Sequence, residues 1–277
     1  MKYTKWKVGL NVEINFLKSL NTLVGVFRNL CEETRDNKQL YNEKMRQLQE
    51  SKEYQHYIEL AVRRMVTPLA VQNMATWRMA AKKASRNPLF YTNLMREVNE
   101  GLKQDIESQV HENAQLIKTL PTDVAEKVTK DIEQYTFEGL RSTEIAKKIK
   151  QYTTQHAKAS AKLIARTEVS KTTTALTKAR CDNLDLRWYV WRTALDGDRV
   201  RKSHRNMEGV LVNWNDPPSP ERLVGEKDIG NYHAGNIWNC RCYPEPLLEL
   251  DDVTWPHRVY YEGKIQTMAK NKFEKIM

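Results

Sequence analysis

Glycine and proline are distributed very unevenly along this chain of 277 residues. Six of the nine prolines and six of the ten glycines lie at or after residue 197. Both residues weaken or end helices, so their scarcity in the earlier part favours helices there, and their density later favours short strands and loops. We place the change near Asp182-Asn183. The chain is predicted to be α+β and mainly α, with an elongated N-terminal helical bundle followed by a small C-terminal α+β module.

Apolar residues recur at helical spacing through most of the first 180 residues. Pro68 and the segment Arg86-Asn87-Pro88 indicate interruptions of this pattern. The predicted helices cover about 8–31, 39–66, 70–85, 89–118, 121–134, 142–152 and 154–181. We therefore divide the chain into a helical bundle at 1–138, a basic helical connector at 139–182, the α+β module at 183–250 and a C-terminal tail at 251–277.

Positive charge is concentrated in the predicted connector. The chain has a formal net charge of +10 and a pI near 9.3, which favours an acidic partner, nucleic acid first and an anionic membrane second. Between Arg141 and Arg180 there are ten Lys or Arg against two acids. This is the pattern of a surface that contacts phosphates without reading sequence. The alternatives are a basic protein without a polyanion partner, or a solvated helix face with its acids elsewhere in the fold. The candidate DNA-binding residues are Lys147, Lys148, Lys158, Lys162, Lys171 and Lys178.

Cysteine usage and hydropathy bear on the compartment. Four cysteines in a chain of this length are too few for a disulfide scaffold, so a reducing environment is expected. The apolar run from Phe16 to Phe27 is broken by Lys18 and is followed by no small-residue cleavage site, so we expect no signal peptide. No apolar run reaches the roughly 18 residues that a bilayer crossing needs. We expect no membrane partner and a protein kept inside a cell unless an assembly carries it out.

Three strands are predicted in the module, at 186–193, 210–214 and 239–243, with a short helix at 199–207 that ends at Gly209. Alternation in the first strand places on one face Trp188, Val190 and Arg192, and on the other Tyr189 and Trp191. Pro244 and Pro246 cannot donate to a strand ladder, so they confine the third strand to an edge or a terminus.

Paired thiols near the end of the module suggest a metal site. On a strand, Cys240 and Cys242 would project to the same face, about 7 Å apart. Zinc takes about four nitrogen or sulfur ligands, and the available set is His204, His233, Cys240 and Cys242. Zinc is thus the candidate cofactor. A redox-capable pair and two buried structural thiols are the competing interpretations.

An enzymatic interpretation uses some of the same side chains. His204, His233, Glu208 and Asp198 include a possible general base and metal ligands for phosphodiester hydrolysis. However, a histidine beside Ser203 is more often structural, and no nuclease motif is complete. We therefore assign no catalytic residue, expect no enzyme, and keep a metal-dependent DNA-processing nuclease as the alternative.

Four motifs in order carry a family resemblance: Ile164–Glu168, Asp198–His204, Gly209 and Asn239–Cys242. With them the chain resembles the phage Mu F-like head morphogenesis family, which comprises minor head proteins of tailed bacteriophages. The resemblance covers about 139–246. Val200 stands where the family usually has threonine, and an extra residue in Asp196-Gly197-Asp198 leaves open which aspartate corresponds to the family's.

The resemblance implies a virion protein of the capsid interior, present in the host cytoplasm during assembly. Its implied partners are the portal protein, a capsid or scaffold protein and double-stranded DNA. His204, Cys240 and Cys242 become candidate metal-binding or core-organising residues. A polar network tying the basic helix to the module is implied for Arg166, Glu168, Asp198, Arg199 and Arg201. Some relatives carry a toxin or nuclease domain after this module. Only 27 residues follow from Asp251 in this sequence, so we expect no appended enzyme.

Overall fold

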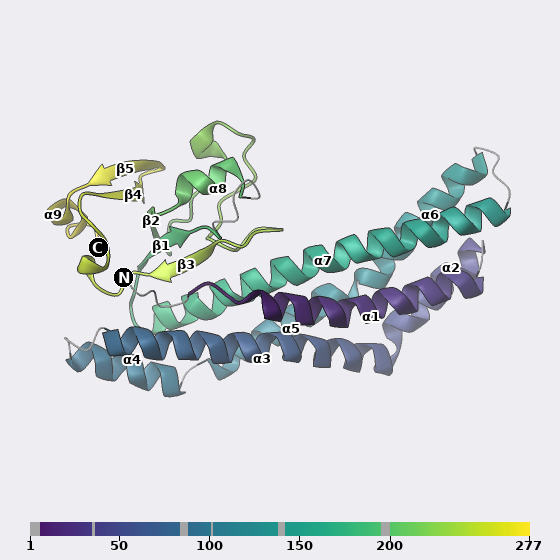
Figure 1. Ribbon diagram of the computed structural model, residues 1–277, viewed down its shortest axis with the longest axis horizontal. Coiled ribbons are helices and arrows are strands. Elements are labelled where there is room, and N and C mark those ends of the chain that lie inside the picture. The colour runs from purple at the N-terminus through teal and green to yellow at the C-terminus, as the bar shows by residue number, and fades with distance from the viewer. Residues whose placement is uncertain (1–5, 35–36, 84–87, 101, 138–141, 195–199) are drawn as a thin grey trace. The chain divides into compact units, whose positions relative to one another are not determined.

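The computed structural model describes residues 6–34, 37–83, 88–100, 102–137, 142–194 and 200–277 (Figure 1). The chain forms two compact units. The helical unit comprises 10–66 and 107–165. The sheet unit comprises 1–9, 67–106 and 166–277. The fold is α+β and mainly α, as predicted.

Helices make up the described chain as far as residue 183. They are α1 Leu10–Thr34, α2 Lys38–Glu50, α3 Lys52–Lys83, α4 Pro88–Glu100, α5 Lys103–Lys118, α6 Leu120–Phe137 and α7 Ser142–Asn183. None of the described helices combines the length and the apolar composition that a bilayer crossing requires. In the helical unit, α1 buries one apolar face, on which Phe16, Leu20 and Phe27 are almost fully covered.

The break between α2 and α3 lies at Ser51, where the sequence predicted an uninterrupted helix. The Ser51 hydroxyl accepts a hydrogen bond from the Tyr54 amide at 3.2 Å and so caps the start of α3. Pro68, predicted to interrupt a helix, lies inside α3. A second unpredicted break follows α4, where Leu102 has a φ of 80° just before α5 begins.

The sheet unit contains a five-stranded mixed sheet in the order β3-β1-β2-β4-β5. Its strands are β1 Trp188–Arg192, β2 Leu211–Asn213, β3 Tyr243–Pro246, β4 His257–Tyr261 and β5 Lys264–Met268. The alternation predicted for β1 is confirmed: Trp188 and Val190 pack in one apolar cluster, and Tyr189 and Trp191 pack in another. Both faces of β1 are therefore buried.

Residues predicted as a tail belong to this sheet. Strands β4 and β5 form a hairpin whose turn, Glu262-Gly263, has positive φ at both positions, as a type I′ turn requires. Strand β2 pairs with β4 in parallel. The short helix α9, Lys270–Phe273, brings Phe273 against Trp188 with ring centroids 4.8 Å apart. Strands β4 and β5 thus extend the sheet beyond β2 (Figure 1), and Phe273 packs on the face that carries Trp188.

Strand β3 begins four residues later than predicted. Asn239 has a φ of 57°, which is incompatible with an extended chain, so Cys240 and Cys242 lie in a loop and the ladder starts at Tyr243. The edge position predicted from Pro244 and Pro246 is confirmed, because β3 is the outermost strand beside β1.

Helix α7 is continuous, although two helices were predicted for this range. Its C-terminal half presents hydroxyl groups at helical spacing to the loop that precedes β3. Thr167 accepts from the Asn239 amide at 3.0 Å, Ser170 donates to the Cys240 carbonyl at 2.7 Å, and Thr174 donates to the Ala234 carbonyl at 2.7 Å. This loop is therefore held along its length by α7.

Gly235 lets the loop approach α7 this closely. A Cβ at this position would lie 2.6 Å from Thr174 Oγ1 and 2.7 Å from the Cys242 carbonyl oxygen. Its φ of +84° is also one that glycine adopts readily. Any side chain at 235 would push the cysteine-bearing segment away from the helix.

Candidate metal centre

One imidazole and two thiols meet inside the sheet unit. His204 lies on the short helix α8, Lys202–Met207, and the two cysteines lie in the loop before β3. The exposed fractions of His204, Cys240 and Cys242 are 2%, 4% and 5%. Trp191 packs edge-on against the imidazole with ring centroids 5.7 Å apart. The structure thus brings together three of the four residues predicted as metal ligands.

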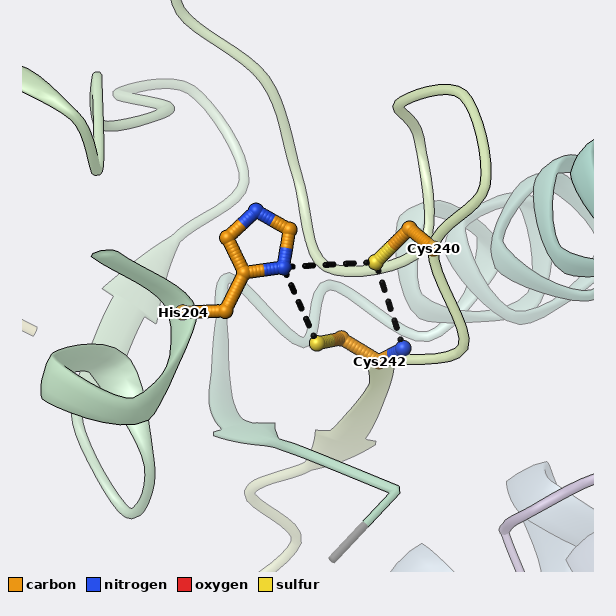
Figure 2. Close-up of side chains that lie close together, drawn as sticks. All are labelled: His204, Cys240 and Cys242. Carbon is orange, nitrogen blue, oxygen red and sulfur yellow. Dashed lines mark hydrogen bonds between the residues drawn. The ribbon is translucent and has the colours of Figure 1, made fainter. Parts of the chain in front are cut away.

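The spacing of the donor atoms fits a tetrahedral metal. His204 Nδ1 lies 3.5 Å from Cys240 Sγ and 3.4 Å from Cys242 Sγ (Figure 2). Zinc–sulfur bonds of about 2.3 Å and zinc–nitrogen bonds of about 2.0–2.1 Å, at a tetrahedral angle, place nitrogen and sulfur about 3.6 Å apart. The three donor atoms lie within 4.8 Å of one another. This His/Cys cluster is thus a group that could hold a metal ion.

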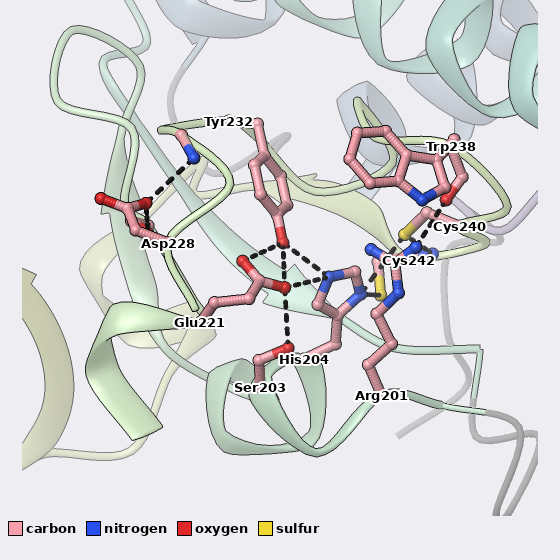
Figure 3. Close-up of polar contacts among 11 residues, drawn as sticks. Arg201, Ser203, His204, Glu221, Asp228, Tyr232, Trp238, Cys240 and Cys242 are labelled. Atoms are coloured by element: carbon pink, nitrogen blue, oxygen red, sulfur yellow. Dashed lines mark hydrogen bonds and ion pairs between the residues drawn. The ribbon is translucent and has the colours of Figure 1, made fainter. Parts of the chain in front are cut away.

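A buried carboxylate orients the imidazole. The Tyr232 hydroxyl donates to both Glu221 oxygens, at 2.8 and 2.7 Å, and lies 2.9 Å from His204 Nε2 (Figure 3). Burial, followed by the hydrogen bond to Glu221, raises the pKa of Tyr232, so this hydroxyl keeps its proton. Since that proton goes to Glu221, the hydroxyl must accept from His204 Nε2–H. Nδ1 therefore presents its lone pair to the two sulfurs, as a metal ligand does.

Glu221 is itself fixed by a further hydrogen bond. The Ser203 hydroxyl donates to Glu221 Oε1 at 3.0 Å, and the carboxylate is only 5% exposed. Carboxylate–histidine pairs of this kind commonly support metal ligands. The sequence did not single out Glu221 or Tyr232, because neither stands in a motif and the loop that carries them has no regular period.

The pKa values of the two thiols are shifted in opposite directions. The hydrogen bond from Cys242 lowers the pKa of Cys240 well below its ordinary value. The pKa of Cys242 is raised well above its ordinary value by the hydrogen bond to Cys240 and by burial. The Cys240 thiolate is thus stabilised by the neighbouring Cys242, and a thiolate is the form that binds metal.

His233, predicted as a fourth ligand, lies outside this cluster. Its Nδ1 is 3.1 Å from the Tyr189 hydroxyl, and its ring packs 4.9 Å from that of Trp214. Burial, followed by the charge of Lys178, lowers the pKa of His233 to about 4. It is a neutral packing residue here.

Acid is expected to destabilise the sheet unit through His233. An unfolded histidine titrates near 6.5, whereas the folded one titrates at about 4. Between pH 6.5 and pH 4, His233 is protonated in the unfolded chain but not in the folded one. The free energy of unfolding therefore falls as the pH drops from 6.5 toward 4, by about 3 kcal/mol in total. Urea unfolding of wild type and His233→Phe at several pH values checks this. The variant should lose less stability on acidification; parallel pH dependences would contradict the prediction.

Part of the chain is similar in sequence to known proteins. Residues 126–244 match the family model described as "Phage Mu protein F like protein". The chain carries a phage Mu F-like segment. A curated relative is an "Uncharacterized protein" of Haemophilus influenzae (strain ATCC 51907 / DSM 11121 / KW20 / Rd), 33% identical over 140 residues, which are 50% of this chain and 29% of the relative. The chain thus spans under a third of that relative's length. No solved structure matches.

The Mu F-like segment contains α7, the His/Cys cluster and the start of β3. It confirms the resemblance that the sequence motifs indicated. Of the implied polar network, Arg166 Nη1 donates to Asn239 Oδ1 at 2.6 Å, and the buried Glu168 lies 3.6 Å from Lys171 Nζ. Arg201 donates to the Trp238 carbonyl at 3.0 Å. Asp198 and Arg199 lie outside the described residues.

The six candidate lysines on α7 fall into two groups. Lys147, Lys148, Lys158 and Lys162 are exposed. By contrast, Lys171 is half-buried beside Glu168, and Lys178 Nζ is 2.6 Å from Asp182 Oδ2. The last two already have acidic neighbours within the fold, so they are weaker candidates for phosphate contacts.

The residues of the nuclease alternative do not converge among the described positions. Glu208 Oε2 accepts from the Thr193 amide at 2.6 Å and from the Thr193 hydroxyl at 2.7 Å. His233 contacts Tyr189, and His204 lies in the cluster. These three residues therefore make separate contacts, Asp198 lies outside the described residues, and the alternative remains a prediction.

Proposed function

We propose that this protein is a minor head protein of a tailed bacteriophage that lies inside the capsid. There it associates with the portal, with a capsid or scaffold protein and with packaged DNA, and it aids head assembly or genome ejection. The carrying observation is the Mu F-like segment at 126–244. The relative from Haemophilus influenzae has no described activity in its name, so it adds only the sequence relationship.

In this proposal the cluster of His204, Cys240 and Cys242 binds zinc. The nitrogen and sulfur donors suit zinc, and their spacing and burial fit a tetrahedral ion. Zinc there would join α8 to the loop before β3, two segments that are 36 residues apart in sequence between His204 and Cys240. Its role is to stabilise the module, while Tyr232 and Glu221 hold the imidazole in the ligating tautomer.

The exposed lysines of α7 form the proposed DNA surface. Lys147, Lys158 and Lys162 are separated by 11 and 4 residues, so they lie within about 60° of one another around the helix axis. They span about 22 Å at 1.5 Å per residue. None of the three has an ion-pair partner among the described residues. A row of this kind can follow phosphates along a duplex without sequence preference.

Localisation tests the proposal directly. In a phage that encodes this chain, we expect the protein in purified procapsids and in virions at a few copies per particle, as measured by quantitative mass spectrometry. The portal protein serves as an internal standard in the same samples. Fractions of the infected lysate without particles provide the control. Absence from both kinds of particle would overturn the proposal.

A further inference from the structure

A cavity of about 260 Å³ opens beside the His/Cys cluster in the sheet unit. Its positively charged lining side chains are Arg166, Arg201 and Arg241, and it also contacts Asn239 and the three cluster residues. The described lining residues include no carboxylate. A cavity with three guanidinium groups on its wall favours an anion, and guanidinium suits phosphate because it donates two parallel hydrogen bonds.

Arg201 leaves part of its hydrogen-bonding capacity unused. Its Nη2 donates to the Trp238 carbonyl at 3.0 Å, whereas its buried Nη1 has no hydrogen-bond partner within the part of the chain that the structure describes. Figure 3 shows the Arg201 side chain extending toward Trp238, close to the two cysteines in this view. A buried donor without an acceptor is costly, so a bound anion would supply what the protein does not.

An exposed aromatic ring lies beside the same guanidinium. Trp238 is 49% exposed, unlike the fully or nearly covered Trp188, Trp191 and Trp214. The Arg201 guanidinium carbon lies 5.5 Å from the centroid of the Trp238 ring. A cationic cavity beside an exposed indole is the combination by which proteins hold single-stranded nucleic acid, with phosphate on the cations and a base stacked on the ring.

We propose that the cavity lined by Arg166, Arg201 and Arg241 binds a phosphate of single-stranded DNA whose neighbouring base stacks on Trp238. Double-stranded DNA does not offer an unpaired base face, so this site differs in substrate from the lysine row on α7. Strand ends and locally opened stretches of a packaged genome are the form of DNA that it would take. The site does not depend on Lys147, Lys158 and Lys162, which belong to the helical unit.

Binding of a 5′-phosphorylated oligothymidylate tests this, measured by fluorescence anisotropy with the full chain. All proteins carry the substitutions Lys147→Gln, Lys158→Gln and Lys162→Gln, so that the outcome is separate from that of the α7 surface. We expect Arg201→Gln to weaken binding at least about tenfold and Trp238→Leu at least about fivefold. Lys202→Gln is the matched control, because it removes one charge from the adjacent, exposed position and should change affinity less than about threefold.

Competition distinguishes the sources of phosphate. Unlabelled oligothymidylate should displace the probe at far lower concentration than inorganic phosphate does, and this difference should shrink in Trp238→Leu. Arg241→Gln provides a second variant should Arg201→Gln prove unstable, with the same expected direction. Equal losses in Arg201→Gln and Lys202→Gln, unchanged binding in Trp238→Leu, or competition by inorganic phosphate as strong as that by the oligonucleotide would overturn the proposal.

Discussion

Replacing Cys240 and Cys242 together by serine is expected to remove bound zinc and to lower the unfolding temperature of the sheet unit strongly. Structural zinc contributes about 10–16 kcal/mol of binding free energy in peptides that fold only with the metal. The sheet unit also has a large aromatic core that does not depend on zinc. We therefore expect the loss of zinc to cost only part of that free energy. A loss of about 5 kcal/mol would correspond to roughly 10–20 °C in Tm. Elemental analysis for zinc and calorimetry measure the two consequences.

Cys31→Ser is the matched control for this variant. Cys31 is also a buried free thiol, but it lies on α1 and outside the cluster. It should therefore keep one zinc per chain and the Tm of the sheet unit. A wild-type protein that contains no zinc, and whose Tm does not change in chelator, would show that the cluster is only a packed set of thiols and imidazole.

Removing three lysines from the exposed row on α7 is expected to abolish most duplex binding. If Lys147, Lys158 and Lys162 each neutralise one phosphate, the salt slope falls by about 0.9 for each of them. Together they lower the slope by about 2.7, which corresponds to a factor of about 500 in the binding constant between 1 M and 0.1 M salt. The triple glutamine variant should therefore bind a random duplex about 500-fold more weakly at 0.1 M salt. A salt titration by fluorescence anisotropy gives both the affinity and the slope.

The double variant Lys171→Gln/Lys178→Gln tests whether the loss of affinity comes from the exposed lysine row or only from the lower net charge. These two lysines lie on the same helix but beside Glu168 and Asp182. Their removal should lower affinity far less per charge than removal of the exposed three. Equal losses per charge in the two variants would reduce the effect to net charge and would refute the row as a binding surface.

Much of the sheet unit could be predicted from the sequence because its patterns are local. The alternation along Trp188–Arg192 and the exclusion of Pro244 and Pro246 from a central strand follow from the geometry of a single strand. The β4–β5 hairpin was missed although Glu262-Gly263 is a two-residue turn between alternating segments.

Other features depend on partners that one sequence does not name. The segment around Tyr152 lacks glycine and proline, and the polar β-branched residues there cost a helix only a few tenths of a kcal/mol each, so α7 continues through it. The meeting of His204 with the cysteines could be inferred from chemistry. The support from Glu221 and Tyr232 could not, because it arises from an irregular loop. The division of the chain into four domains remains a prediction.

The prolines of β3 also determine whether another strand can pair with this edge of the sheet. The Leu247 amide donates to the Trp188 carbonyl at 3.0 Å, so alternate amides of this segment face β1 and the nitrogens of Pro244 and Pro246 face outward. The outer border therefore offers too few donors for a sixth strand to attach. Neighbouring copies of the protein are therefore not expected to join by strand pairing through this border.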